Sequence, residues 1–215
     1  MTRKKDGVVA DMQAAGDPER AARDKASNRT DRDCWGVPAG VLNDTAKALR
    51  DDLSVDHRVL IADALWRAEV FDLRLLALKL LTQARIRPDD GVWALLERWV
   101  HQLDCRALAD AHAAAAGRRL VALPARLEVV EDWTDAASIW TRRAALEATR
   151  PWAKMNNPSE AEREVRDHIL GWVAAMAEDA RPLIRQAVDG WLRDLAKRDP
   201  ERAAAVRDQS GSARL

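Results

Sequence analysis

Apolar residues recur at steps of three and four along most of this chain, which is the spacing of helices that bury one face. After Ser54, for example, Leu60, Ile61, Ala64 and Leu65 fall on a single stripe. The pattern predicts helices over residues 8–26 with a break at 16–18, 41–53, a segment after 54, 72–84, 92–103, 105–116, 118–130 with a break at 124, 134–149, 158–175, 182–197 and a short one from 199. The remaining ends, 1–7 and 209–215, are expected to be frayed, and 30–38 is expected to be a loop.

Residues that favour helix ends agree with these boundaries. A short side-chain oxygen before a helix satisfies a backbone N–H that would otherwise lack a partner. Such residues precede four of the predicted helices: Ser54, Asp89, Thr134 or Asp135, and Ser159 with Glu162. Gly117 is placed to end the 105–116 helix in a left-handed turn, and Pro151 is placed to stop the 134–149 helix.

The predicted helices are about 10 to 18 residues long and are joined by short loops, so that pairs recur about every 35 to 45 residues. That spacing is typical of stacked antiparallel helical hairpins, which build a curved solenoid with a concave face. We therefore predict an all-α protein with a charged segment of short helices over 1–30, one helical-repeat domain over 31–208 and a flexible tail over 209–215.

Composition supports this class and excludes others. Glycine and proline are few, and nine tryptophans stand beside one phenylalanine and no tyrosine. No run is apolar enough for a membrane span or a signal peptide, so we expect a cytoplasmic protein. Cys34 and Cys105 stand alone without histidines at ligand spacing, which argues against a zinc site. Whether these two cysteines pair is left open.

The total charge carries no signature of nucleic-acid binding, because 35 Lys and Arg balance 35 Asp and Glu. Local excesses of positive charge do occur, in three groups along the chain: Arg98, Arg106, Arg118, Arg119 and Arg126; Arg142, Arg143 and Arg150; Arg185, Arg193, Lys197 and Arg198. On one concave face, these groups would form a stripe able to neutralise DNA phosphates. The alternative is an ordinary helical surface with interspersed ion pairs.

Familiar enzyme motifs are absent from the sequence, and its four histidines do not form a metal-ligand group. Asp110 is the carboxylate of interest, because it lies among alanines and leucines with Arg106 one helical turn earlier. Its functional interpretation is a carboxylate held over a cationic leaving group, and its structural one is a simple (i, i+4) ion pair. Trp140 and Arg143 would share a helix face with small alanines, which describes either a contact surface or a buried tryptophan.

Residues 35–206 resemble the AlkD-type DNA alkylation repair proteins. The similar pieces, in order, are Trp35-Gly36-Val37-Pro38, Ala64-Leu65-Trp66, Leu95 to Val100, Ile139 to Leu146 and Ile184 to Pro200. The last two are the most specific. The resemblance implies a HEAT-like repeat fold with a basic concave cradle for duplex DNA.

The resemblance also implies a monofunctional glycosylase for N3- and N7-alkylated purines that works without a flipped-base pocket. The family's cleft uses a Trp, an Asp four residues later, an Arg in a later helix and a Trp in the penultimate long helix. Matched by position, the Asp is Asp110 and the Arg is Arg143. Arg106 stands at the first Trp position and Gly190 at the last, with Trp191 one place further. Two of the four cleft residues are thus replaced.

We therefore predict a DNA glycosylase with Asp110 and Arg143 as its catalytic residues. The expected DNA contacts are Arg106, Arg118, Arg119, Trp140, Arg142, Trp191, Arg193 and Lys197. The alternatives are a non-catalytic protein of the same fold that binds distorted or branched DNA, and a helical scaffold for a protein partner. Each needs no metal or cofactor. We expect double-stranded DNA as the partner, a monomer, no membrane association, and a nucleoid location when DNA is bound.

Overall fold

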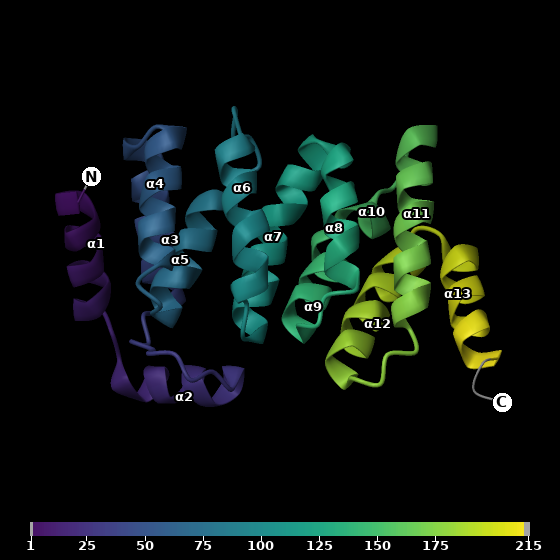
Figure 1. The fold of residues 1–215 in the computed structure, drawn as a ribbon, viewed down its shortest axis with the longest axis horizontal. Coiled ribbons are helices and arrows are strands. Elements are labelled where there is room, and N and C mark those ends of the chain that lie inside the picture. Colours follow the sequence, from purple (N-terminus) through teal and green to yellow (C-terminus); the bar gives the residue numbers. More distant parts are fainter. Residues whose placement is uncertain (1, 213–215) are drawn as a thin grey trace. The chain divides into compact units, whose positions relative to one another are not determined.

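The computed structural model describes residues 2–212, and every regular element in that range is helical, so the predicted all-α class is confirmed (Figure 1). The chain divides into two compact units, Met1–Arg119 and Leu120–Leu215. The single repeat domain predicted over 31–208 stays a prediction. Within residues 2–212, no helix combines the length and the hydropathy that crossing a membrane requires.

The first unit is built from short helices joined by tight loops. They are α1 (Thr2–Ala14), α2 (Pro18–Asn28), α3 (Ala39–Asp52), α4 (Val55–Trp66), α5 (Phe71–Leu81), α6 (Asp90–Trp99), the 3-10 turn η1 (Val100–Gln102) and α7 (Arg106–Ala122), whose last turn enters the second unit. Figure 1 shows α2 running crosswise to α1. The side-chain amide of Asn28 accepts the Ala107 backbone N–H at 3.2 Å, so the end of α2 is tied to the start of α7.

The centre of the first unit is α5, which packs against α3 and α4. Its leucines at 73, 76, 78, 80 and 81 are fully buried, as an apolar stripe that wraps most of the helix requires. Trp66 of α4 stacks on Trp99 of α6 at 4.4 Å between ring centroids, and the Arg74 guanidinium lies 4.4 Å from the Trp66 ring. The tryptophans of two motifs that carry the resemblance therefore form core rather than surface.

The predicted loop at 30–38 is confirmed, and its Trp35-Gly36-Val37 motif has a structural cause. The Asp72 carboxylate accepts the backbone N–H groups of Trp35 at 2.7 Å and Val37 at 2.8 Å. Gly36 between them has φ +73°, and an added Cβ would lie 2.2 Å from the Asp17 carbonyl oxygen. Only glycine combines this backbone conformation with so close an approach.

The predicted end of a helix at Gly117 is wrong, because α7 continues through Gly117 to Ala122. The reason lies two residues later, where the fully buried Arg119 side chain contacts the loop before α6. Its guanidinium donates to the carbonyl oxygens of Gln83 at 2.6 Å and Ala84 at 2.9 Å, and to the Asp89 carboxylate at 3.1 Å. These bonds outweigh the cost of about 1 kcal/mol for a glycine inside a helix.

The second unit continues with η2 (Pro124–Arg126), α8 (Leu127–Thr134), α9 (Ile139–Ala148), α10 (Arg150–Lys154), α11 (Glu160–Met176), α12 (Pro182–Ala196) and α13 (Pro200–Ser212). In this unit α9 packs against α8 and α12, and α12 also packs against α10 and α13. Trp133, Trp152 and Trp191 are among its largest fully buried side chains. The core of this unit therefore rests on indoles, as the composition indicated.

Of the four capping predictions, two are confirmed and two are wrong. Ser159 and Glu162 form the predicted capping box, and Ser54 accepts the His57 N–H as predicted. Asp89 precedes α6 but makes no side-chain cap bond, because its carboxylate faces Arg119. The helix predicted from Thr134 or Asp135 instead begins at Ile139.

That correction has a local cause, because Ser138 rather than Thr134 caps α9. The Ser138 hydroxyl accepts the N–H groups of Trp140 and Thr141, and Thr134 is the last residue of α8. The predicted frayed ends are also partly wrong. Helix α1 begins at Thr2 and α13 runs to Ser212, while the predicted tail at 213–215 lies outside the described residues.

Candidate nucleic-acid interface

The sequence-predicted site residues fall in both units. Asp110, Arg106, Arg118 and Arg119 belong to the first, and Trp140, Arg142, Arg143, Trp191, Arg193 and Lys197 belong to the second. The predicted residues are therefore described below unit by unit.

In the first unit, Asp110 and Arg106 lie one turn apart on α7. The Arg106 Nε atom is 3.5 Å from an Asp110 carboxylate oxygen, which is the (i, i+4) pair that the spacing predicts. Both side chains reach solvent, and that of Asp110 is 41% exposed. The pair is thus a surface ion pair that approaching groups can reach.

Beside this pair, the alanines of α7 line a hollow between helices. Ala111 and Ala114 line a cavity of 320 Å³ together with Arg50 of α3 and Lys79 of α5. Arg50 donates to the Lys79 carbonyl oxygen at 3.0 Å, and the Lys79 ammonium donates to the Asn43 side chain at 2.7 Å. Two small alanines and two cations therefore line a hollow that a phosphate group could enter.

A second hollow of 280 Å³ shares Lys79 and Ala111 with the first. Its other lining includes Arg20 and Asp24 of α2. Burial raises the pKa of Asp24, and the nearby charge of Asp72 raises it further. The charge along this part of the surface is therefore mixed, and the cations concentrate at Arg50 and Lys79.

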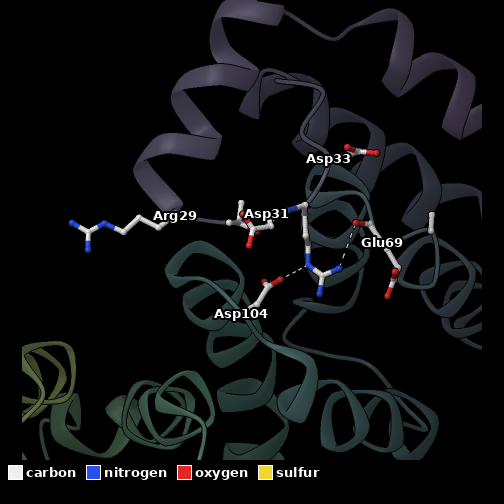
Figure 2. Close-up of a pocket in the computed structure, with 8 residues that line it drawn as sticks. Arg29, Asp31, Asp33, Glu69 and Asp104 are labelled. Carbon is white, nitrogen blue, oxygen red and sulfur yellow. Dashed lines mark hydrogen bonds and ion pairs between the residues drawn. The ribbon is translucent and has the colours of Figure 1, made fainter.

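A larger pocket of 680 Å³ in the first unit has a different chemistry (Figure 2). Asp31, Asp33, Glu69 and Asp104 line it, and Figure 2 shows the Arg29 side chain extending away from Glu69 and Asp104. Arg32 lies 2.5 Å from Asp104. With four carboxylates in its lining, this pocket repels phosphate, and it is not part of the candidate interface.

In the second unit, α9 carries Arg143 into the protein interior. The Arg143 side chain is only 3% exposed, and its guanidinium lies 3.1 Å from one carboxylate oxygen of Glu147. It also donates to the Leu183 carbonyl oxygen at 3.4 Å, where α12 begins. Arg143 therefore connects α9 to α12 and places a buried positive charge behind Glu147.

The other carboxylate oxygen of Glu147 accepts a hydrogen bond from Arg150 at 2.8 Å. Arg150 also donates to Asp194 of α12, from Nε at 2.9 Å and from Nη2. Burial lowers the pKa of Arg150, but the hydrogen bonds that it donates to Glu147 and Asp194 outweigh burial and raise that pKa. Two lysines approach the same Asp194 carboxylate, Lys154 at 3.6 Å and Lys197 at 4.0 Å.

A second group of charges surrounds Asp179 in the loop before α12. Arg142 reaches the Asp179 carboxylate at 2.9 Å, and Arg181 holds it through two side-chain hydrogen bonds. The bonds from Arg181 are the main reason why the pKa of Asp179 lies well below its usual range. Arg185 donates to the Asp179 and Ala180 carbonyl oxygens. Arg142 is thus engaged in fixing this loop.

The remaining predicted DNA contacts differ in exposure. Arg118 and Arg193 are exposed, and Trp140 is half-buried. Arg119 and Trp191 are fully buried, because Arg119 holds the loop before α6 and Trp191 belongs to the apolar stripe of α12. A side chain without exposed surface cannot touch DNA without local rearrangement, so neither residue enters the proposals below.

Sequence reasoning did not consider Arg50 or Lys79, and it placed Arg150 in a basic group without naming it as a DNA contact. Lys79 had a signal, since it is the lone lysine within the leucine-rich stretch 72–84. Asn43 and Arg50 are seven residues apart, which is two helical turns. The sequence therefore also predicted that these two residues of the hollow share one face of their helix. The position of Arg150 depends on Asp194, 44 residues away, and no local pattern reveals that pairing.

Metal chemistry has no support in the described part of the chain, where no three His, Cys, Asp or Glu side chains group as ligands. Cys34 and Cys105 are both free thiols. Burial raises the pKa of each thiol to about 11, so both stay protonated and unreactive at neutral pH.

Comparison with known proteins gives a consistent picture. The family model described as "DNA alkylation repair enzyme" matches residues 8–208. A predicted DNA alkylation repair enzyme from Enterococcus faecalis is 18% identical with a TM-score of 0.74, over 90% of this chain and 89% of that one. AlkD2 from Streptococcus mutans is 19% identical with a TM-score of 0.61, over 78% and 79%. At these identities the structures establish the fold alone. No curated protein matches the chain.

Proposed function

Because the chain belongs to the DNA alkylation repair enzyme family, we propose that it is a monofunctional DNA glycosylase that removes N3- and N7-alkylated purines from duplex DNA. Such bases carry a positive charge and leave the sugar as neutral molecules. The enzyme then needs mainly to stabilise the positive charge that develops on the sugar in the transition state. A correctly placed carboxylate supplies that stabilisation.

The observation that carries the proposal is the position of Asp110. Its side chain is 41% exposed on α7, and the next residue in the helix, Ala111, lines the hollow. The partner Arg106 is also exposed, and an exposed (i, i+4) pair contributes only about 0.3–0.5 kcal/mol. Arg106 can therefore move aside at little cost when a cationic sugar or base approaches the Asp110 carboxylate.

The remaining cations would hold the DNA backbone. Arg50 and Lys79 border the hollow in the first unit and are suited to phosphate contact. In the second unit, the buried Arg143 is assigned a positioning role. Its charge, 3.1 Å from Glu147, reduces the repulsion that this carboxylate would exert on phosphate. Double-stranded DNA is accordingly the proposed partner.

The experiment is the release of N7-methylguanine and N3-methyladenine from methylated duplex DNA. We expect wild-type protein to release both bases, and Asp110→Asn to slow release about 100-fold or more, as the loss of one transition-state contact does. Asp132→Asn is the matched control, because Asp132 is an exposed carboxylate on α8. Equal rates for Asp110→Asn and wild type would remove Asp110 from the mechanism.

A non-catalytic DNA-binding function is the second candidate, and specific observations favour it. Arg106 stands 3.5 Å from Asp110 and neutralises part of its charge. Arg150 lies over Gly190, so a cation occupies a position where the family resemblance implies an aromatic ring. A protein altered in this way could retain duplex binding without base excision.

Two measurements separate the candidates. Under the second function, the wild-type protein binds undamaged or branched duplexes in a salt-sensitive manner and releases no base. Under the first, base release exceeds spontaneous loss and depends on Asp110. A chain that binds duplex DNA no better at low salt than at high salt would contradict both, because phosphate contacts always carry a salt dependence.

A further inference from the structure

We propose that Arg150, Lys154 and Lys197 form a phosphate-binding site on α10 and α12, seated over Gly190, that takes a phosphodiester of the DNA backbone. The inference rests on the proposed DNA-binding function and adds to it a defined contact site in the second unit. These three residues belong to the second unit, whereas the hollow lined by Ala111 and Ala114 belongs to the first.

In this cluster the cations are more exposed to solvent than the carboxylates that they contact. The side chains of Arg150, Lys154 and Lys197 are 29%, 57% and 65% exposed. Those of Glu147 and Asp194 are each only 12% exposed. An approaching ligand therefore meets three positive groups first. With Arg143, four cations face two carboxylates, which leaves a net charge of about +2 in this cluster.

The Arg150 guanidinium is held in place but not saturated. It has five N–H groups, and three of them serve Glu147 and Asp194. The other two N–H groups, one on each terminal nitrogen, make no hydrogen bond to residues 2–212. A guanidinium fixed by two carboxylates loses little conformational entropy on binding, and its planar donors match phosphate oxygens.

Gly190 leaves the Arg150 guanidinium uncovered. A Cβ added at this position would lie 3.9 Å from the guanidinium carbon and from Nη1, and 4.0 Å from Nη2. A methyl group would therefore just touch Arg150, whereas a larger side chain would cover the guanidinium or displace it from Asp194. Glycine at this position thus keeps the proposed phosphate seat open.

The ligand follows from the same charges. Three exposed cations repel a positively charged base but attract phosphate oxygens. In a glycosylase of this kind, the cluster would therefore bind the DNA backbone and not the cationic lesion.

The test is equilibrium binding of undamaged duplex DNA, measured by fluorescence anisotropy between about 50 and 200 mM salt. Arg150→Met removes the charge and keeps the length of the side chain. Gly190→Leu covers the guanidinium and changes no charge. Each variant is expected to weaken binding about tenfold and to reduce the slope of log affinity against log salt by about one.

Two controls keep the result specific. Gly171→Leu should bind like wild type, because it places the same side chain on a glycine of α11 that has open space around it and lies outside the cluster. Arg163→Ala removes an exposed arginine of α11 that lies outside the cluster and should leave the salt slope unchanged. Thermal melts of every variant check the fold, and Gly190→Leu tests the site even if Arg150→Met destabilises its two carboxylate partners.

A closed dumbbell duplex without strand ends distinguishes an internal phosphodiester from a terminal phosphate. The proposal predicts the same loss on the dumbbell as on linear DNA. It is overturned if Arg150→Met and Gly190→Leu bind with wild-type affinity and slope, or if their effect vanishes on the dumbbell. If wild-type protein itself fails to bind duplex DNA, the proposed function fails along with this site, which is a separate and recognisable outcome.

Discussion

Gly190 gives a stability prediction. It lies within α12, where glycine is less favourable than alanine by about 0.5–1 kcal/mol. Since a Cβ fits beside Arg150, Gly190→Ala is expected to raise the unfolding free energy by that amount. Gly36→Ala is the contrasting control, because φ +73° and a contact of 2.2 Å with the Asp17 carbonyl oxygen make it destabilising. Chemical denaturation measures both, and a destabilised Gly190→Ala protein would contradict the geometry at α12.

The contribution of His112 to the unfolding free energy should depend on pH. It is fully buried on α7 with Nε2 2.7 Å from the Leu96 carbonyl oxygen, and burial lowers its pKa from 6.5 to about 4. Between these values the unfolded chain binds more protons than the folded one, so stability falls as the pH falls. From pH 7 to pH 5 the loss attributable to His112 is about 2 kcal/mol. Urea denaturation at both pH values measures it, and the pH dependence should shrink by that amount in His112→Gln.

Residue roles were the hardest feature to predict from sequence. Arg118 and Arg119 are neighbours of the same type, yet the first is exposed and the second is fully buried. The difference in burial arises from the loop at 83–89. Its carbonyl oxygens accept hydrogen bonds from Arg119, and Arg118 faces solvent. No local pattern contains that information. The Arg106–Asp110 pair, by contrast, followed directly from its spacing.

At the scale of elements, Arg119 joins α7 to the loop that precedes α6. Arg119→Met would leave the carbonyl oxygens of Gln83 and Ala84 and the Asp89 carboxylate without this donor. We expect a loss of about 3–5 kcal/mol in unfolding free energy. Arg118→Met is the matched control, and an exposed substitution of this kind stays within about 0.5 kcal/mol. Similar melting temperatures for the two variants would contradict the structural role of Arg119.

The loop before α12 depends on Asp179 in a comparable manner. Its folded pKa lies below that of the unfolded chain, mainly through the hydrogen bonds of Arg181. The stabilisation is therefore fully present above the unfolded pKa and is lost as the pH falls toward the folded value. Asp179→Asn should lower the melting temperature at pH 7, and its difference from wild type should shrink toward pH 3. Asp189→Asn, at an exposed position of α12, should show neither effect.

Helices were the most predictable elements, because their apolar stripes and caps are local. Ser54 and Ser159 capped as expected, whereas α9 began at Ser138 rather than at Thr134. The error arose because Thr134 is the last residue of α8. It therefore cannot also cap the start of α9. Gly117 failed as a helix end because tertiary bonds of Arg119 extended α7.

At the scale of the whole molecule, the two units carry complementary chemistry. The first presents Asp110 beside an alanine-lined hollow, and the second presents cations above buried carboxylates. The sequence could locate Asp110 and Arg143 through the family resemblance. It could not show that Arg143 is buried against Glu147, or that Arg150 lies over Gly190, because both depend on contacts between helices.

Duplex binding by the full chain should depend strongly on salt. If Arg50, Lys79, Arg150 and the two lysines of the cluster contact about four to five phosphates, the slope of log affinity against log salt is about −4. Lys79→Ala should reduce this slope by about one, independently of DNA sequence. A slope near zero would contradict phosphate binding by either unit.

The most direct test of the central claim is base release from methylated duplex DNA with protein in excess over DNA. The account predicts that wild-type protein frees N7-methylguanine or N3-methyladenine well above the spontaneous rate, and that Asp110→Asn reduces the rate constant about 100-fold or more while duplex binding persists. The contradicting result is no release above background by wild-type protein that is folded and bound to DNA.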